Sequence, residues 1–393
     1  MSDQNVSRYD LRGVSASKSE VHDAIKDMDK GLYPQAFCKV LPDYIGKDKD
    51  YCNIMHADTA GTKTSLAYIY WRETNDLSVW AGIVQDSIVM NVDDMACVGC
   101  IDDIIISSTV GRNKSVIPGS VITEVIQAAD TFIKKMAEHD LSIHLSGGET
   151  ADVGDIVRTI DVGITAFGRM PRNQVIRNEI KSGDVIVGLA SYGQASYETE
   201  YNGGMGSNGL TSARHDILSK VYRAKYPESY NPKTPEHLVY SGSKELTESV
   251  DITKALRISA GKLILSPTRT YMPIIKKILT NHRDQVNGMI HCTGGAQTKV
   301  MKFVQNKRVI KDNLLPIPPL FQLIESESQT PRKEMYEVFN MGHRLEVFTD
   351  ETTAQSIIDI SKSFNVDAQI IGRVEEHTHN ELIIKDDQGE YIY

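Results

Sequence analysis

The sequence predicts a two-domain α/β protein, and three observations support this prediction. The chain has 393 residues, enough for two or three domains that each bury a core. Segments with strand character alternate with amphipathic helices along most of the chain. A connector at residues 171–181 precedes a glycine-bounded strand at 183–191, where a new unit begins. We therefore predict an N-terminal extension over residues 1–45, a first domain over 46–170 and a second over 171–393.

The composition is that of a globular protein, with 40% hydrophobic and 24% charged residues. A net charge of −9 disfavours general binding to nucleic acid or a membrane surface, so an anionic ligand would need a local pocket. The sequence shows no apolar signal region and no long apolar run, so we expect a cytoplasmic protein. Five cysteines favour reduced thiols, and Cys97 and Cys100, despite their zinc-like spacing, are interpreted as helix-end cysteines.

The N-terminal extension combines a helix-compatible stretch at residues 17–30 with a turn and a short apolar run at 31–37, which suits a flap or a surface strap. The first domain then opens with a strand at 52–58, a glycine turn at 59–63 and a helix at 64–73. An acid at the strand end and Thr-Lys at the helix start favour phosphate binding, although the P-loop spacing is absent. A plain strand–turn–helix connection remains the alternative.

The most informative stretch is residues 86–99, where carboxylates recur at helical spacing inside an apolar segment. Its apolar residues share one stripe of a helix, so that face is predicted to be buried. Such acids repel one another unless a cation or solvent separates them, and hard divalent cations prefer their oxygens. A magnesium site and a solvated acidic face therefore both remain open. The polar side of the helix carries Asp86, Asn91, Asp93 and Asp94.

Two further glycine turns could approach a ligand. A strand at 141–145 runs into the first, at 146–152, where Gly147 and Gly148 would let the backbone come close and Glu149 could face the same cation. The other, after a strand-like run at 286–290, exposes consecutive N–H donors that suit an anion. The remaining elements expected are strands at 104–110, 156–168 and 345–348 and helices at 121–138, 273–279 and from residue 210 onward.

These blocks resemble a known family. Three of them match in order and spacing the phosphoribosylformylglycinamidine cyclo-ligases, also called aminoimidazole ribonucleotide synthetases: Asp58-Thr-Ala-Gly-Thr-Lys63, Met90-Asn-Val-Asp-Asp-Met95 and Gly147-Gly-Glu-Thr-Ala-Asp152. The second half adds Ser-Asn-Gly, Pro-Thr-Arg-x-Tyr, His-x-Thr-Gly-Gly and Glu-Met-x-x-x-Phe-Asn-Met-Gly in family order. The last two blocks look specific to the cyclo-ligase among its superfamily relatives.

The resemblance implies a homodimer whose N-terminal sheets pair into a barrel. It also implies ATP- and Mg²⁺-dependent closure of formylglycinamidine ribonucleotide to aminoimidazole ribonucleotide, in purine synthesis, through a phosphorylated amide. We hypothesise that Asp58, Asp94 and Glu149 hold Mg²⁺ and that Asp94, Lys63, Asn208 and His291 are catalytic. ATP contacts are assigned to Asp58, Gly61, Thr62, Lys63, Asp86, Asn91, Gly147, Gly148, Glu149 and Thr150. Substrate contacts are assigned to Ser207, Asn208, Gly209, Arg269, Thr293, Gly294 and Gly295.

The chain also departs from the family pattern, as a divergent member would. Thr59 and Ala296 stand where the family usually has glycine, residues 31–37 replace a glycine-rich segment, and the loop at 192–206 is longer. Most important, the family's histidine before Ser-Asn-Gly is Gly206 here, and the nearest candidate substitute is His215 on the following helix.

Three other interpretations stay open. One is a different ATP-using enzyme of the superfamily, for which Cys38-Lys39 superficially fits the reactive cysteine of selenophosphate synthetase. Another is a nucleotide-binding protein without catalysis, and the third is a structural dimer, which would leave the acids unexplained.

Overall fold

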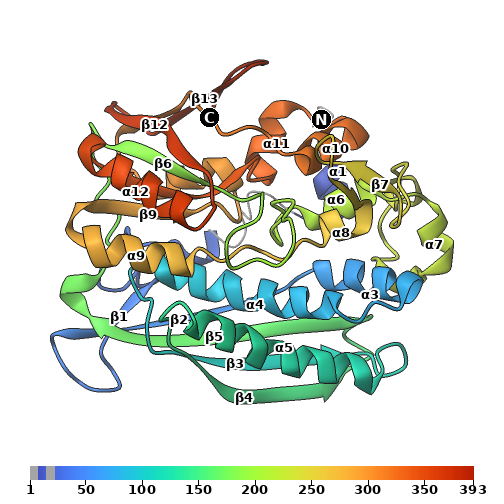
Figure 1. Cartoon of the computed structure of the whole chain (residues 1–393). Helices are drawn as coiled ribbons and strands as arrows, with labels where there is room; N and C mark the ends of the chain where they lie inside the picture. The colour runs from blue at the N-terminus through green and yellow to red at the C-terminus, as the bar shows by residue number, and fades with distance from the viewer. Residues whose placement is uncertain (1–7, 15–22) are drawn as a thin grey trace.

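The computed structural model describes residues 8–14 and 23–393, and it confirms a two-domain α/β architecture. Figure 1 shows one sheet at the bottom, a layer of long helices above it and a second sheet at the top. The N-terminal part of the helix expected at 17–30 lies outside the described residues. None of the described helices combines the length and apolarity needed to cross a membrane.

The first sheet is open and has the strand order β1-β2-β5-β3-β4. Strands β3 and β4 are parallel, and the other neighbours are antiparallel. Three helices cover one face, because the buried side chains of the strands alternate with exposed ones and point toward them. The elements are β1 (Val40–Pro42), β2 (Tyr51–Thr59), α3 (Lys63–Thr74), α4 (Val79–Ala96), β3 (Ile104–Arg112), α5 (Gly119–Ala137), β4 (Ile143–Asp152) and β5 (Ile160–Pro171).

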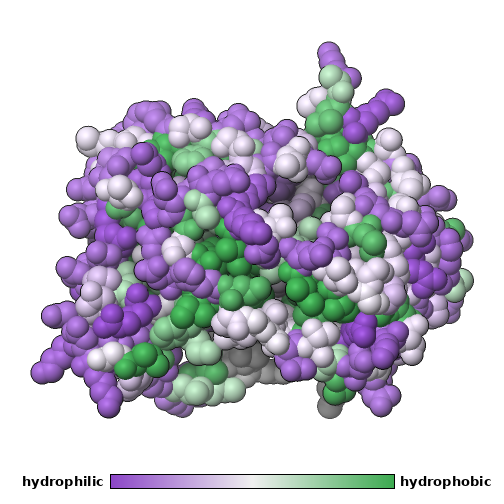
Figure 2. Space-filling model, turned by 60° about the horizontal axis from the view of Figure 1, so that its bottom comes forward, coloured by the Kyte–Doolittle hydropathy of each residue, from purple (hydrophilic) through white to green (hydrophobic). Residues whose placement is uncertain are grey.

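The opposite face of this sheet is left open (Figure 1). Met55, Phe167 and Ile105 occupy one transverse row on it, as the strand register shows. Met55 is 62% exposed and Ile105 is 45% exposed, which is unusual for large apolar side chains. Figure 2, with the lower side of Figure 1 turned forward, shows apolar residues gathered on this side of the molecule. This face is therefore a candidate contact surface.

The second sheet is larger, with the order β14-β13-β10-β12-β6-β11-β9. Helices α9 and α12 pack together on it, and α12 also contacts β6 and β12. Its strands are β6 (Val185–Ala190), β9 (Val286–His291), β10 (Lys307–Lys311), β11 (His343–Thr349), β12 (Ala368–Glu376), β13 (Glu381–Asp386) and β14 (Gly389–Ile392). Its main helices are α6 (Leu210–Ile217), α9 (Met272–His282), α10 (Pro319–Ser328), α11 (Arg332–Val338) and α12 (Glu351–Ser363).

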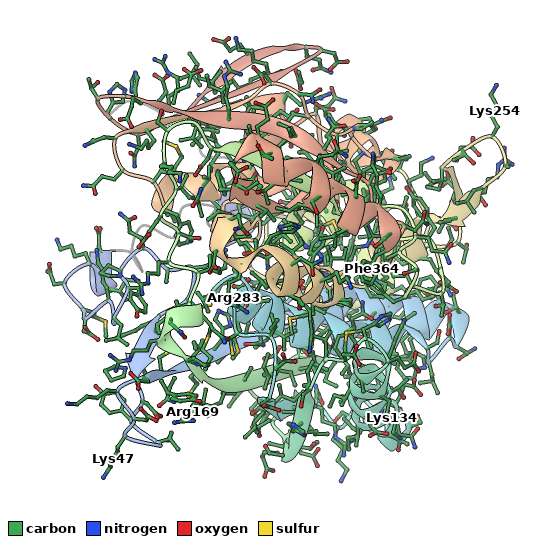
Figure 3. The ribbon with its side chains drawn as sticks, turned by 60° about the vertical axis from the view of Figure 1, so that its left-hand side comes forward. Lys47, Lys134, Arg169, Lys254, Arg283 and Phe364 are labelled. Carbon is green, nitrogen blue, oxygen red and sulfur yellow. The ribbon has the colours of Figure 1, made fainter. Side chains whose placement is uncertain are left out.

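Two further segments complete the fold. A hairpin of β7 (Ser249–Asp251) and β8 (Arg257–Ser259) carries Lys254 at its tip, which points outward in Figure 3. In the described part of the N-terminal extension, the Arg12 guanidinium lies 2.7 Å from Asp216 of α6 in the second domain. Later in the extension, β1 pairs with β2 of the first sheet, and the Phe37 ring stacks on the Phe303 ring of the second domain with centroids 5.1 Å apart.

Helix α4 lies between the two domains, so both of its sides are buried (Figure 1). Asp86, Asn91 and Asp93 are at most 1% exposed, and Asp94 is 7% exposed. The solvated acidic face that the sequence left open is therefore excluded. The second domain supplies the hydrogen-bond donors that make this burial tolerable.

The turn expected at residues 146–152 is instead part of a strand, which is the main correction to the predicted fold. Strand β4 continues to Asp152 in register with β3, with an irregularity between Ile106 and Ser108. Gly147 adopts a φ of 100° there, because the extra residue of such a bulge needs a conformation that glycine tolerates.

Candidate functional site

Asp94 is the centre of a polar cluster where the two domains meet. Its Oδ1 lies 2.7 Å from Nδ1 of His291, at the end of β9, and its Oδ2 lies 3.4 Å from Nε2 of His56 on β2. His56 also meets the side-chain oxygen of Asn91 at 2.9 Å, and the Asn91 amide donates to the backbone oxygen of Asp58 at 3.5 Å. The structure thus brings together four of the predicted site residues, Asp58, Asn91, Asp94 and His291.

The hydrogen bonds assign the protonation of this pair. Arg344 Nε donates to His291 Nε2 at 3.1 Å, and a guanidinium has no acceptor, so the imidazole proton must be on Nδ1, facing Asp94. Burial lowers the pKa of His291 to about 4, so the ring is neutral at pH 7. Burial alone would raise the pKa of Asp94, but Lys299, His291 and His56 outweigh it and lower that pKa, so Asp94 stays a carboxylate.

The buried neutral histidine predicts a pH dependence of stability. The pKa of His291 is about 4 when folded, and that of an unfolded histidine is about 6.5. Between these values the unfolded chain binds more protons, so His291 should cost up to about 3 kcal/mol of folding free energy as the pH falls from 7 to 4. We expect urea unfolding of His291→Asn to show a flatter pH slope over this window, since the amide keeps a donor for Asp94 but does not titrate. Equal pH slopes for the wild type and His291→Asn would contradict the lowered pKa of His291.

Lys299 is a basic residue of the site that the sequence did not single out. It comes from a 3-10 helix at Ala296–Lys302, and its ammonium donates to Thr293 Oγ1 at 2.5 Å. It also lies 4.4 Å from the centre of the Phe37 ring. The Thr-Gly-Gly turn ends just before this helix, so a lysine shortly after such a turn was the available signal. The sequence analysis did not single out His56 either. The available signal was its place two residues before Asp58, because residues two apart share one face of a strand.

The two turns predicted to hold substrate lie side by side. The side-chain nitrogen of Asn208 is 3.6 Å from the place where Gly294 would carry a Cβ. Asn208 and Thr293 also line one small cavity together with Gly206 and Arg344. Gly209 starts α6 with a φ of 76°, and Ser207 Oγ is buried without a hydrogen-bond partner among the described residues.

Lys63 and Asp86 do not occupy the positions expected of nucleotide contacts. Both are fully buried, and the Lys63 ammonium donates to Asp86 Oδ1 at 2.8 Å and to the Ser266 carbonyl at 2.6 Å. Asp86 also accepts from the backbone N–H of Thr268 at 2.7 Å. The pair therefore joins the first domain to the second, because the donors that satisfy it come from both.

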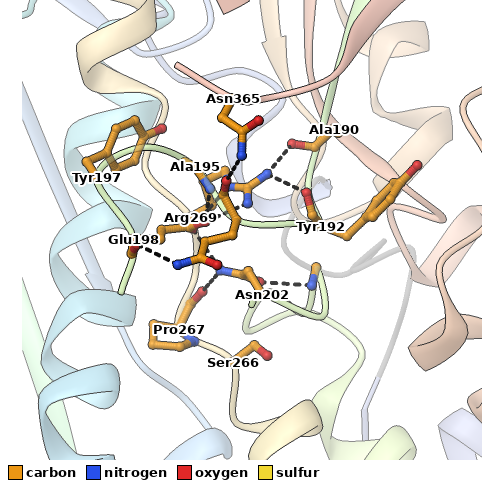
Figure 4. Close-up of polar contacts among 12 residues, drawn as sticks. Ala190, Tyr192, Ala195, Tyr197, Glu198, Asn202, Ser266, Pro267, Arg269 and Asn365 are labelled. Atoms are coloured by element: carbon orange, nitrogen blue, oxygen red, sulfur yellow. Dashed lines mark hydrogen bonds and ion pairs between the residues drawn. The ribbon is translucent and has the colours of Figure 1, made fainter. Parts of the chain in front are cut away.

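Arg269 is likewise committed to the protein rather than to a phosphate. Its Nε and Nη2 donate to the two carboxylate oxygens of Glu198 at 3.0 and 2.6 Å, and Nη1 donates to the carbonyls of Ala190 and Tyr192. Figure 4 shows this arginine as the hub that holds the long loop after β6, with Asn202 and Pro267 beside it. All three guanidinium nitrogens are used, so the phosphate contact assigned to Arg269 is replaced by a structural role.

The β4 residues of the predicted site lie away from Asp94 within one chain. Glu149 is exposed and pairs with Thr109 on β3. The same row continues across the sheet through Gly163 on β5 to Thr59 on β2. Glu149 is therefore three strands, about 14 Å, from Thr59 and on the open face of the sheet. Asp58 points the other way, toward α4. Gly147, Gly148 and Thr150 lie on the same edge strand as Glu149, so they too are away from Asp94 within one chain.

Several weaker candidates receive structural roles. His215 is 1% exposed, its Nδ1 accepts from the backbone N–H of Tyr240 at 3.2 Å and burial lowers its pKa well below the usual value, which together give this histidine a structural role. Burial raises the pKa of the Cys38 thiol well above its usual value, which disfavours a reactive thiolate there. Thr62, after Gly61, contacts Thr211 of the second domain at 2.8 Å between hydroxyl oxygens.

The fold and this cluster define a two-domain α/β protein with carboxylate, imidazole and ammonium groups at the domain junction. The chain belongs to the AIR synthase related protein family, whose N-terminal domain matches residues 38–170 and whose C-terminal domain matches residues 181–385.

Individual relatives agree with this membership. The phosphoribosylformylglycinamidine cyclo-ligase of Methanocaldococcus jannaschii is 28% identical over 83% of this chain and 79% of its own length. The protein of the same name from Methanococcus vannielii is 28% identical over 93% of this chain and 87% of its own length. Among solved structures, "AaThiL complexed with AMPPCP and TMP" covers 96% of each chain with a TM-score of 0.53 at 12% identity, which shows a shared fold.

Proposed function

We propose that this protein is a cytoplasmic phosphoribosylformylglycinamidine cyclo-ligase that closes the imidazole ring of aminoimidazole ribonucleotide in purine synthesis at the expense of ATP. The observation that carries the proposal is the buried Asp94–His291 pair, facing Lys299 and the Thr293-Gly294-Gly295 turn across the domain junction. Relatives of this name match most of the chain, which supports the same reaction here.

The chemistry needs an activated amide. The amide oxygen of formylglycinamidine ribonucleotide attacks the γ-phosphorus of ATP and ADP leaves. The neighbouring amine nitrogen then attacks the activated carbon, the C–O bond to the phosphoryl group breaks, and phosphate departs with loss of a proton from nitrogen. Such a sequence asks the protein mainly for positioning and charge neutralisation.

The residues present fit this demand. Two carboxylates, Asp58 and Asp94, and the Asn91 amide offer the oxygen ligands that Mg²⁺ prefers, and the lowered pKa keeps Asp94 ionised. The cation would neutralise phosphate charge when bound. Neutral His291 fixes the orientation of Asp94, and Lys299 supplies a positive charge for the transferred phosphoryl group.

The direct test is release of ADP with formylglycinamidine ribonucleotide and Mg²⁺, measured against a panel of related amides. We expect ADP formation only with this ribonucleotide, together with rescue of a purine auxotroph that lacks the cyclo-ligase. Nucleotide binding without ADP release on any amide would favour a protein that has lost catalysis, and ADP release on another amide would favour a different enzyme of the family.

We further propose a homodimer in which the two first-domain sheets form a closed barrel. Strand β1 pairs with β2 only at Cys52–Ile54, so the outer edge of residues 55–59 has no neighbour in the sheet, and β4 forms the other edge. The open apolar face would become the barrel interior. Closing two such sheets in a ring sets β4 of one chain against the β2 edge of the other. Glu149 of the partner subunit would then lie beside the end of β2 and reach Asp58 around the rim of the barrel, because the two side chains start on opposite faces of the sheet.

This arrangement predicts complementation between two inactive variants. Asp94→Asn and Glu149→Gln should each lose activity alone, but in a mixed dimer one of the two sites keeps both native residues. Random mixing in equal amounts makes half of the dimers mixed, so ADP formation should recover to about a quarter of the wild-type rate. Two preparations of Asp94→Asn mixed together provide the control. Absence of recovery, with mixed dimers verified by mass spectrometry, would contradict the shared site.

A further inference from the structure

A fully buried arginine with one unused donor lies beside the proposed active site. Arg344, on β11, is 2% exposed, and its Nη1 has no hydrogen-bond partner among the described residues. Its other nitrogens are used: Nε donates to His291 and Nη2 donates to the backbone oxygen of Arg269. A buried charged donor without a partner is costly, so its retention points to a ligand.

Arg344 lines a small cavity together with Asn208, Thr293 and Gly206. The cavity measures about 10 Å³, room for about one water molecule, and therefore for one oxygen atom of a larger ligand. A Cβ placed on Gly206 would lie 3.8 Å from Arg344 Nη1. Because residue 206 has no side chain, the space in front of the guanidinium stays open. We call this cavity the Arg344 niche.

We propose that the Arg344 niche binds one oxygen of the phosphoryl group that passes from ATP to the substrate amide. Arg344 Nη1 would donate to that oxygen, with the Asn208 amide and the Thr293 hydroxyl at its sides. Two observations favour an anionic phosphoryl oxygen over a neutral carbonyl: the charge of the donor, and the hydrogen bond that ties Arg344 to His291 and so to Asp94. This inference rests on the proposed function and adds a substrate-binding residue to it.

Two variants test the niche. Arg344→Met removes the donor, and Gly206→His fills the niche while it leaves the three donor groups of Arg344 in place. Arg373→Met is the matched control, because it also replaces an arginine by methionine but at the surface, where the side chain is 48% exposed and pairs with Asp312 and Glu375. We expect the affinity for inorganic phosphate, titrated calorimetrically with ADP and Mg²⁺ present, to fall about ten- to a hundred-fold in both test variants. The Arg373→Met variant should stay within about twofold of wild type.

Kinetics separate this role from a structural one. Because the phosphoryl group is absent from the free ribonucleotide amide, both test variants should lower kcat for ADP release and leave the KM for formylglycinamidine ribonucleotide nearly unchanged. If Arg344→Met does not fold, Gly206→His decides. Wild-type phosphate affinity in a folded Arg344→Met or Gly206→His protein would overturn the inference.

The phosphate titration does not need turnover, so the two proposals can fail separately. Arg344-dependent phosphate binding in a protein that releases no ADP with any amide would refute the cyclo-ligase and support the niche. Normal ring closure with Arg344-independent phosphate binding would refute the niche and support the cyclo-ligase.

Discussion

Asp94→Asn should lower kcat for ADP formation about a hundred- to a thousandfold. The substitution removes the charge that the site maintains against burial, and it places an amide group where His56 and His291 both approach a carboxylate oxygen. The Mg²⁺ dependence should weaken with it, since one proposed ligand has lost its charge. Steady-state ADP release at several Mg²⁺ concentrations measures both effects.

The adjacent residue provides a matched control. Asp93 accepts from Thr270 Oγ1 at 2.6 Å and from the Tyr271 backbone N–H at 2.8 Å, so it joins the domains without facing the cluster. Asp93→Asn should lower the free energy of unfolding by about 1–3 kcal/mol and leave kcat of the folded enzyme nearly unchanged. A folded Asp94→Asn protein with wild-type turnover and Mg²⁺ dependence would refute the assigned role.

Arg269→Gln should destabilise the protein by about 3–5 kcal/mol, the largest effect on stability that we expect. Arg269 is fully buried, and its loss would leave the Glu198 carboxylate and the carbonyls of Ala190 and Tyr192 without their donor. Urea unfolding at neutral pH measures the change.

A double variant identifies the cause of that loss. Adding Glu198→Gln removes the stranded charge, so Arg269→Gln/Glu198→Gln should be more stable than Arg269→Gln alone. Arg373 forms comparable ion pairs at the surface, with its side chain 48% exposed, and Arg373→Gln should cost less than about 1 kcal/mol. Equal costs at positions 269 and 373 would show that Arg269 is not a structural hub.

The sequence predicted the local elements well because their signals are local. The periodicity around residues 86–99 identified α4 and its polar side, and the strand–turn–helix at 52–73 corresponds to β2 and α3. Asp94 and His291 were both singled out, although they are 197 positions apart in the chain. Only the family resemblance predicted that Asp94 and His291 belong to one site, because periodicity carries no information on contacts between domains.

The predictions that needed distant partners were less successful. Lys63 and Arg269 were expected at phosphates because a lysine at a helix start and the bidentate donors of an arginine suit that role. Their partners Asp86 and Glu198 neutralise them instead, and such pairing depends on the packing of the domains. Glu149 was expected in a turn, but glycine-rich sequence can also continue an edge strand through a bulge.

The domain junction also constrains how ligands reach the site. Asp86, Asp93 and Asp94 each accept a hydrogen bond from the second domain. A hinge motion between the domains would break all three hydrogen bonds at once, which is energetically costly. We therefore expect loading through displacement of the Phe37 segment, which rests on Lys299 by ring contact. Amide hydrogen exchange should then be slow along α4 and fast at residues 31–37, and added nucleotide should slow the latter.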